Sequence, residues 1–399
     1  MLSSELIIKL FDAAYMQRWN DKLRPMEFYE LDKQGHKMFI AFFLAKFEEL
    51  KQKIDWVSLI KGIIFEYLQR LVITDIKPTV FYEIKKDKIK YKALNNYMFR
   101  ELSPLIKCLG NDFSVQFQNY FINGDNNINR QILDAAHLFS SYWEFQILQR
   151  IDPNGFEVKY IKNHYQVMLK QYKNLKGITL LIKQTPIRQL INLIGQLRFQ
   201  NRWSHVHRIP KTSVLGHSFY VAILVFLFSL YINACSKRLY NNTISALFHD
   251  LPEILTRDII SPIKRADKGL EDLIKELEIK QLEKIILPLV PGFLQDEILL
   301  YTQNEFNNLV KINGKIVYIE NEKLISEKYN QDQYNPRDGK LIKAFDDLSA
   351  FIEAFSALKN GCSGPAFSGA MERITEKYEK AELIANKISI KKLLKSFKL

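Results

Sequence analysis

Apolar residues along this chain recur mostly at three- and four-residue spacing, which brings their side chains to one face of an α-helix. Glycine (15) and proline (12) are both sparse in the 399 residues, so few positions interrupt the pattern. Three stretches are rich in turn formers, and we expect loops there: residues 124–129 (GDNNIN), 152–155 (DPNG) and 330–339 (NQDQYNPRDG). The pattern predicts an all-α fold.

One apolar run could be mistaken for a membrane span. Residues 219–232 read FYVAILVFLFSLYI and are apolar apart from Ser229. A helix needs roughly 20 apolar residues to cross a bilayer, and these 14 fall short. We therefore expect a buried core helix and no transmembrane segment.

The C-terminal residues KISIKKLLKSFKL place lysines among apolar residues at helical spacing. Such a segment is typical of an amphipathic tail that docks on the protein and leaves its basic face in water. Contact with nucleic acid or with an anionic lipid surface is the alternative.

Composition narrows the class of protein. The length suits two domains, and 47% hydrophobic residues exclude a disordered chain. The net charge of +13 favours anionic partners, such as phosphates, nucleic acid or a membrane surface, without choosing among them. Cys108, Cys235 and Cys362 form no paired motif, and the N-terminus carries no evident signal peptide. We expect a cytoplasmic protein, and a homodimer stays open.

The stretch SALFHDLPEILTRD, residues 245–258, places His249 and Asp250 directly after an apolar run. Burying ionisable groups costs several kcal/mol unless something compensates them, and a metal ion is one such partner. His249 and Glu253 are four residues apart, which puts both on one face of a helix. One helical turn could therefore hold a metal ligand and a proton-transfer group.

Two further residues complete a donor set. His217 opens the long apolar helix, and Asp346 lies in another helical pattern. With His249 and Asp250 they supply two imidazoles and two carboxylates from three helices. This set suits a divalent transition metal such as Mn, Co, Fe, Ni or Zn, with Mg kept as a further candidate and positions left for water and substrate.

The order of these residues resembles the HD-domain phosphohydrolases and, among them, the bacterial 5'-deoxynucleotidase branch. The matching elements span roughly residues 190–358 and agree in order and spacing: Arg202-Trp203, His217-Ser218, His249-Asp250, Glu253, Thr256, Asp258, Pro262, Lys264 and Asp346. A solitary His-Asp pair would mean little.

The resemblance implies roles for these residues. His217, His249, Asp250 and Asp346 would be the metal ligands, and Glu253 the catalytic carboxylate. Arg202 and Trp203 would contact the substrate, and Asp258 would line the pocket; Arg202 and Asp258 also count among the catalytic candidates. We expect attack of a metal-bound water on a (deoxy)nucleoside 5'-monophosphate, which releases phosphate.

The chain departs from the family pattern at three places. Gly216 stands where the family often has Glu before the first ligand, and Arg257 stands where it often has Gly. Asp347 adjoins Asp346, and only the alignment favours Asp346 as ligand. Residues 313–340 look longer than the equivalent region of single-domain relatives.

Other functions remain alternatives. A phosphodiesterase or a nucleoside triphosphohydrolase could use the same scaffold. A non-catalytic protein that senses nucleotides or binds nucleic acid would also fit the positive charge and the basic tail.

The N-terminal half echoes the C-terminal half. AYMQRWN from Ala14 resembles RFQNRWS from Arg198, and GHKMFIAFFLAKF from Gly35 resembles GHSFYVAILVFLF from Gly216. Two further pairs follow in the same order: FEYLQRLVITDIKP with FHDLPEILTRDIISP, and ILDAAHLFSSYWEF with KAFDDLSAFIEAF. We predict two tandem HD-like helical domains, residues 1–180 and 181–399, of which the second has the intact metal site.

The first copy has a broken ligand set. His36 and Asp134 match ligands, but Glu66, Tyr67 and Arg70 stand where His249, Asp250 and Glu253 stand in the second copy. Loss of these groups removes negative charge that a cation needs. We therefore expect a catalytically dead copy, which packs against a neighbour or senses a ligand. Arg18 and Trp19 could still grip a nucleotide.

Overall fold

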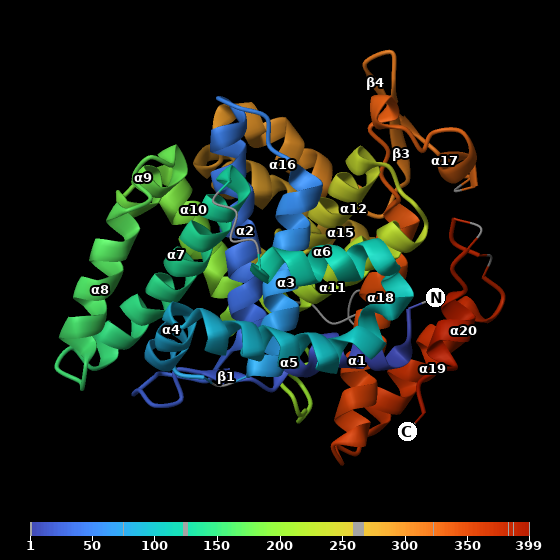
Figure 1. Ribbon diagram of the computed structural model, residues 1–399. Coiled ribbons are helices and arrows are strands. Elements are labelled where there is room, and N and C mark those ends of the chain that lie inside the picture. The colour runs from blue at the N-terminus through green and yellow to red at the C-terminus, as the bar shows by residue number, and fades with distance from the viewer. Residues whose placement is uncertain are drawn as a thin grey trace. The chain divides into compact units, whose positions relative to one another are not determined.

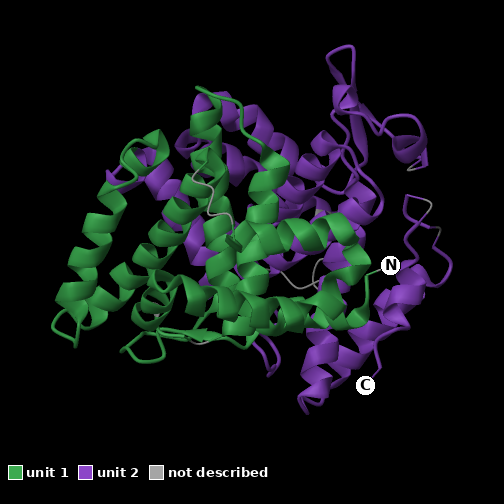
Figure 2. Cartoon of the chain, in the orientation of Figure 1, with its two compact units in different colours: residues 1–179 green, residues 180–399 purple. Residues whose placement is uncertain are grey.

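The computed structural model describes residues 2–74, 76–122, 127–257, 267–321, 323–381, 383–385 and 387–398. In this part of the chain α-helices dominate and the strands form only two short antiparallel pairs, so the all-α prediction is confirmed (Figure 1). The chain divides into two compact units, residues 1–179 and 180–399 (Figure 2). Whether the first unit is HD-like stays a prediction.

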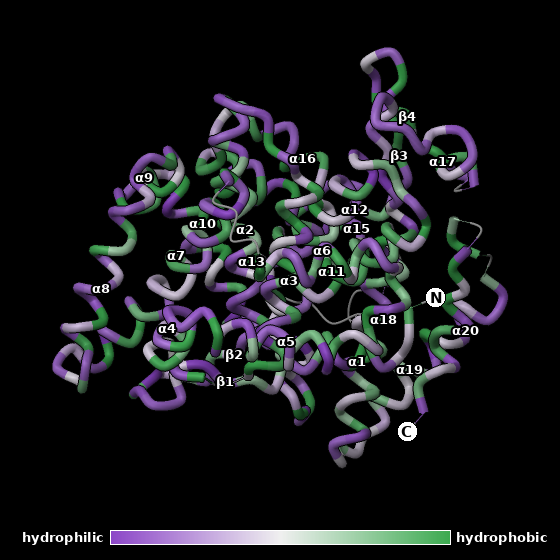
Figure 3. Tube along the Cα trace, viewed as in Figure 1, coloured by the Kyte–Doolittle hydropathy of each residue, from purple (hydrophilic) through white to green (hydrophobic). Residues whose placement is uncertain are grey.

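In the N-terminal unit the long helix α2 packs against α7, and α3 packs against α7 and α5. Apolar residues such as Phe39, Ile40 and Phe43 on α2 are buried, and α7 and α3 also bury their apolar faces. On the outer helix α8, apolar and polar residues alternate along the tube (Figure 3). The elements are α1 Ser4–Phe11, β1 Gln17–Arg18, β2 Phe28–Tyr29, α2 Glu30–Glu49, α3 Trp56–Ile73, α4 Pro78–Lys86, α5 Lys88–Ile106, α6 Asn111–Ile122, α7 Ile128–Ile151 and α8 Val158–Lys170, with α9 Lys176–Ile182 at the junction of the units.

The C-terminal unit is built around α11, which packs against α12 and α18. Its elements are α10 Pro186–Gln196, α11 Val214–Tyr231, α12 Ser236–Phe248, α13 Glu253–Thr256, α15 Lys268–Gln281, α16 Gln295–Thr302, β3 Leu309–Ile312, β4 Lys315–Tyr318, α17 Lys323–Glu327, α18 Gly339–Lys359, α19 Pro365–Glu379 and α20 Ile390–Leu394. These three helices carry the predicted metal ligands.

Helix α11 begins where Ser213 accepts a hydrogen bond from the backbone N–H of Gly216, which satisfies one of the unpaired donors of the first turn. By length and composition this helix could span a membrane, and 89% of it is buried inside the protein. This burial is what we expect of a core helix.

A buried ion pair joins α12 to the start of α18. The Arg238 guanidinium donates to both carboxylate oxygens of Asp338, at 2.7 and 2.8 Å. The side chain of Asn242 on α12 also donates to Asp338 and accepts from its backbone N–H. Breaking a buried pair of this kind costs about 3–5 kcal/mol, so it fixes the two helices that carry His249 and Asp346.

The first residue of α18 has to be glycine. A Cβ atom on Gly339 would lie 2.2–2.4 Å from backbone atoms of Phe306 and Asn307. The buried side chain of Arg337 holds the same segment, because its guanidinium donates to the carbonyls of Leu300 and Asn304. Close contact at this point brings residues 304–307 to the N-terminal end of α18.

The basic tail is docked. Ile390, Leu393 and Leu394 of α20 are buried, and the Phe397 ring lies against Phe351 and Phe355. Lys391 and Lys395 pair with Glu379 on α19, at 2.7 and 3.5 Å. Two of the tail's lysines therefore have acidic partners within the protein, while Lys392 and Lys398 are exposed.

An Arg-Trp-Glu arrangement occurs once in each unit. In the C-terminal unit Arg202 Nε and Trp203 Nε1 donate to the same oxygen of Glu353, at 3.2 and 2.8 Å. In the N-terminal unit Arg18 Nε and Trp19 Nε1 donate to one oxygen of Glu144, at 2.9 and 2.8 Å. Both tryptophans have a left-handed backbone, with φ of 58° and 55°. The local geometry of the two segments is therefore the same.

Candidate metal centre

His217 lies one turn into α11 and is 1% exposed. Its Nδ1 is 3.0 Å from the hydroxyl of Ser349, and its Nε2 is 3.1 Å from Oδ1 of Asp346 and 3.6 Å from Oδ2 of Asp250. The serine contact fixes the ring orientation. Nε2 is therefore the nitrogen that faces the carboxylates.

His249 follows the last residue of α12 and is 6% exposed. Its Nδ1 lies 2.8 Å from the carbonyl oxygen of Ala246, which can only accept, so Nδ1 carries the proton in the neutral ring. Its Nε2 then presents a lone pair 3.2 Å from Oδ1 of Asp250 and makes no hydrogen bond. Two acceptors this close repel each other unless a positive charge lies between them.

Asp346 and Asp347 point to different partners. Oδ1 of Asp346 lies 3.1 Å from His217 Nε2 and 3.9 Å from His249 Nε2. Asp347 instead accepts hydrogen bonds from Lys377 and from the Tyr378 hydroxyl on α19. Geometry thus places Asp346 with the histidines and Asp347 in a contact between helices.

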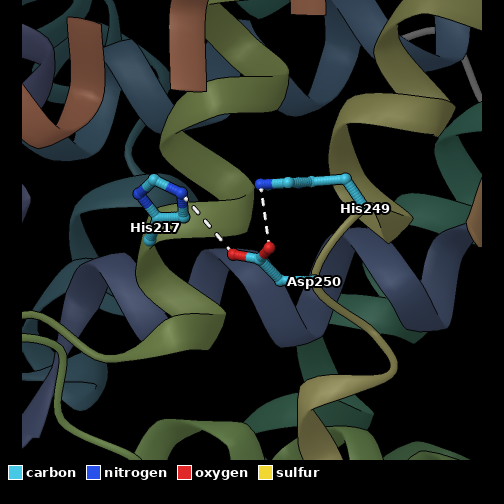
Figure 4. Close-up of side chains that lie close together, drawn as sticks. All are labelled: His217, His249 and Asp250. Carbon is cyan, nitrogen blue, oxygen red and sulfur yellow. Dashed lines mark ion pairs between the residues drawn. The ribbon is translucent and has the colours of Figure 1, made fainter. Parts of the chain in front are cut away.

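The donor atoms of His217, His249 and Asp250 lie within 4.8 Å of one another, and the two rings approach the Asp250 carboxylate from either side (Figure 4). Imidazole and carboxylate donors from three helices suit a divalent transition metal. A metal ion would accept the buried His249 lone pair and offset the charge of the carboxylate opposite it. The residues present therefore fit a metal ion, which His217, His249, Asp250 and Asp346 would hold.

Charges around the centre keep the Asp346 carboxylate ionised. Burial alone would raise the pKa of Asp346, but the Lys343 ammonium and the His217 ring outweigh it and hold this pKa well below the usual value. An ionised carboxylate is the form that binds a cation.

Arg202 lies beside the centre. Its Nη1 is 3.8 Å from Oδ2 of Asp250, while its Nε is bound by Glu353. The Trp203 indole N–H also donates to Glu353, and its ring packs on Phe367, with centroids 5.5 Å apart. The structure therefore brings Arg202 to the donor set, whereas it gives Trp203 a packing contact with α19.

Glu353 holds the Arg202 segment in place. This fully buried carboxylate accepts hydrogen bonds from Arg202, Trp203 and the Thr212 hydroxyl. Burial alone would raise its pKa, but Arg202, Arg208 and His217 lower the pKa to about 2. Our sequence prediction did not include Glu353, although it follows Asp346 on the same face of α18, two helical turns later.

Glu253 begins α13 and is 8% exposed. Its backbone N–H donates to the carbonyl of Asp250 at 3.1 Å, so one tight turn joins it to the donor set. Thr256 lies on the same short helix. Asp258, Pro262 and Lys264 lie outside the described residues.

Three side chains near the centre were not among the predicted site residues. The Phe306 ring lies 6.1 Å from the His249 ring, and the Lys343 ammonium lies 4.8 Å from the Phe306 centroid. Burial raises the pKa of neighbouring Glu305. Lys343 could have been noticed, because it stands one helical turn before Asp346. Nothing local in the sequence marks Phe306.

The first unit brings no comparable donors together. His36 packs its ring against Trp143, Glu66 pairs with Lys37, and the Tyr67 hydroxyl donates to the carbonyl of Leu10. Within the described part of residues 1–179, no three His, Cys, Asp or Glu donors come as close as those of the second unit.

Comparisons with known proteins agree with this geometry. The HD-domain family matches residues 194–375. A 5'-deoxynucleotidase of Pasteurella multocida (strain Pm70) is 24% identical over 171 residues, which cover 42% of this chain and 73% of that protein. All four donors lie inside the matched segment. The comparisons therefore support an HD domain at residues 194–375 that resembles a 5'-deoxynucleotidase, and with it a metal-dependent phosphohydrolase.

Proposed function

We propose that the C-terminal unit releases phosphate from nucleoside 5'-monophosphates, with deoxynucleotides among its substrates. The observation that carries this proposal is the cluster of His217, His249 and Asp250 donors with the Arg202 guanidinium beside it. The resemblance to the Pasteurella 5'-deoxynucleotidase supports the choice of substrate.

Each residue of the site has a separate role in this reaction. A divalent ion in the donor set would supply a Lewis acid that lowers the pKa of water and offsets phosphoryl charge. Arg202, whose Nη1 lies 3.8 Å from Oδ2 of Asp250, binds the phosphate. Glu253, which is held next to Asp250, transfers a proton to the departing sugar oxygen. The buried Ser349 and Ala246 contacts keep both imidazoles aimed at the centre.

Phosphate release tests this proposal. Nucleoside mono-, di- and triphosphates and a phosphodiester are incubated with the protein and Mn, Co, Ni, Zn or Mg. We expect inorganic phosphate and nucleoside from monophosphates. His249→Ala should lose both bound metal and activity, whereas Glu253→Gln should keep its metal and lose turnover by about 10²–10⁴-fold.

The exposed His207 provides the control, because His207→Ala removes an imidazole from the same domain without touching the donor set. Full activity in His249→Ala would contradict the proposal. Pyrophosphate or a nucleotide as the main product would favour a triphosphohydrolase or a phosphodiesterase instead.

We also propose that the N-terminal unit is an inactive copy of the same domain. The repeated Arg-Trp-Glu arrangement supports this proposal. In this unit the side-chain nitrogen of the buried Lys33 lies 2.7 Å from Nδ1 of His137, which precedes Glu144 on α7 by two helical turns. This contact pairs an imidazole with an amine, whereas a metal site needs carboxylates and free imidazole lone pairs.

Two buried carboxylates hold Arg18 in the N-terminal unit. It pairs with both Glu30 and Glu144, at 2.6 and 2.9 Å, and these two carboxylates are buried. The N-terminal unit is therefore a structural unit in our proposal, and nucleotide capture by Arg18 is the less supported alternative.

A further inference from the structure

Lys343 lies on α18 one turn before Asp346, with its side chain 38% exposed. Its ammonium is 2.7 Å from Oδ2 of Asp346 and 3.1 Å from Oδ1 of Asp347. The other oxygen of Asp346 faces His217. One carboxylate thus separates the ammonium from the metal position, so Lys343 lies at the edge of the centre.

Each carboxylate of the donor set has its own cationic neighbour. Arg202 lies beside Asp250, and Lys343 lies beside Asp346. A phosphate dianion that enters the centre meets both carboxylates, and like charges at this range repel each other. Two cations at the rim offset this repulsion better than Arg202 alone.

The ammonium has a hydrogen left to donate. A protonated lysine carries three N–H groups, and Asp346 and Asp347 accept from two directions. The Phe306 ring covers another side of the ammonium at 4.8 Å without accepting a conventional hydrogen bond. The partial exposure of Lys343 leaves room for a ligand oxygen.

We propose that Lys343 is a phosphate-binding residue of the C-terminal site and that it holds the phosphoryl oxygens together with Arg202. This inference rests on the proposed phosphohydrolase function. It adds a residue that the family resemblance does not assign. The Phe306 ring then packs against the Lys343 ammonium and keeps it directed at the site.

Binding of inorganic phosphate to the metal-loaded full-length protein tests the proposal without any turnover. Isothermal titration calorimetry should give a dissociation constant about tenfold weaker for Lys343→Met than for the natural chain. Lys343→Arg should recover most of the loss, because it keeps the charge. Metal affinity should stay equal or increase in Lys343→Met, since a competing cation leaves Asp346.

Lys340→Met is the matched control. Lys340 lies on the same helix and is exposed, and its ammonium donates to the backbone carbonyl of Glu320 rather than to the centre. This variant should bind phosphate like the natural chain. If Lys343→Met lowers stability too far, Lys343→Gln preserves part of the polar contact and replaces it.

The outcomes separate this inference from the proposed function. Equal phosphate affinity in Lys343→Met, Lys340→Met and the natural chain would overturn the role of Lys343 even where nucleotides are hydrolysed. Loss of metal binding in Lys343→Met would assign the lysine a purely structural role and overturn it as well. Weakened phosphate binding in a protein that hydrolyses no nucleotide would support Lys343 and contradict the proposed substrate.

Discussion

Glu353 is a buried carboxylate outside the predicted ligand set, yet three side chains of the domain depend on it. It accepts hydrogen bonds from Arg202, Trp203 and Thr212. Its pKa of about 2, against an ordinary 4.5, means that the folded state binds its ionised form more tightly than the unfolded state does. The same charge therefore both stabilises the fold and orients the Arg202 side chain.

Glu353→Gln should lower the free energy of unfolding by about 3 kcal/mol at pH 7, which is the energy that corresponds to the lowered pKa. Because the folded pKa is depressed, this stability is fully present above about pH 4.5 and is lost as the pH falls toward 2. Urea denaturation at several pH values should show a shallower acid slope in the variant.

Glu376 on α19 is exposed, so Glu376→Gln should leave both the stability at pH 7 and the acid slope unchanged. An acid slope in Glu353→Gln as steep as in the natural chain would show that other carboxylates control the pH dependence.

For single residues, the sequence predicted which side chains could bind a metal better than it predicted where those side chains point. The motif singled out His217, His249, Asp250 and Asp346, and these side chains lie close together in the fold. The choice between Asp346 and Asp347 needed the structure, because two adjacent positions on a helix differ by about 100° in direction. The partners on α19, Lys377 and Tyr378, are what distinguish them.

Among the helices and strands, long apolar runs were the easiest to foresee. The run at residues 219–232 became helix Val214–Tyr231, and the start differs because the helix begins at the Ser213 cap rather than at the first strongly apolar residue. The hairpin of β3 and β4 was missed. Asn313 and Gly314 have φ of 49° and 80°, and Asn-Gly between alternating residues is a strong hairpin pattern that we passed over.

Arg257 ends the short helix α13 in a backbone conformation that favours glycine. Its φ is 65° and its ψ is 166°, a region that other residues rarely adopt. This geometry explains in physical terms why the family pattern often has glycine at this position. The chain keeps an exposed arginine there at an energetic cost of about 1–3 kcal/mol.

Arg257→Gly should therefore stabilise the protein by about 1 kcal/mol, since relief of backbone strain exceeds the extra freedom that glycine gives the unfolded chain. Arg257→Ala removes the same charge but keeps a Cβ atom, so it should give no gain. Urea denaturation of both variants compares them directly. Equal stability of the two would show that the backbone is not strained.

At the scale of the whole molecule, the sequence predicted an all-α chain, and the structure confirms it. The network of Arg238, Asn242 and Asp338 could not be predicted, because its members are about a hundred residues apart and no local pattern links them. The alignment of the halves likewise paired His36 and Asp134 with ligands, whereas His36 contacts Trp143.

The number of metal ions bound per chain tests both units of the molecule at once. The natural protein should bind one divalent ion per chain, and His249→Ala should bind none, because the N-terminal unit places Lys33 and His137 together instead of a donor set. Saturation at 100 times the dissociation constant should stabilise the C-terminal unit by about 2.7 kcal/mol. Elemental analysis after dialysis counts the ions. A second ion that persists in His249→Ala would contradict the inactive copy.

Because contacts within the protein hold the two imidazoles, the rate of metal exchange should depend on the ion rather than on refolding of the site. Ser349 and the carbonyl of Ala246 hold the two rings through contacts within the protein, and α11 is buried along nearly all of its length. A chelator should therefore strip the ion without unravelling the chain. Reloading should then follow the pace at which the incoming ion sheds its water, so different metals would compete on kinetics as well as on affinity.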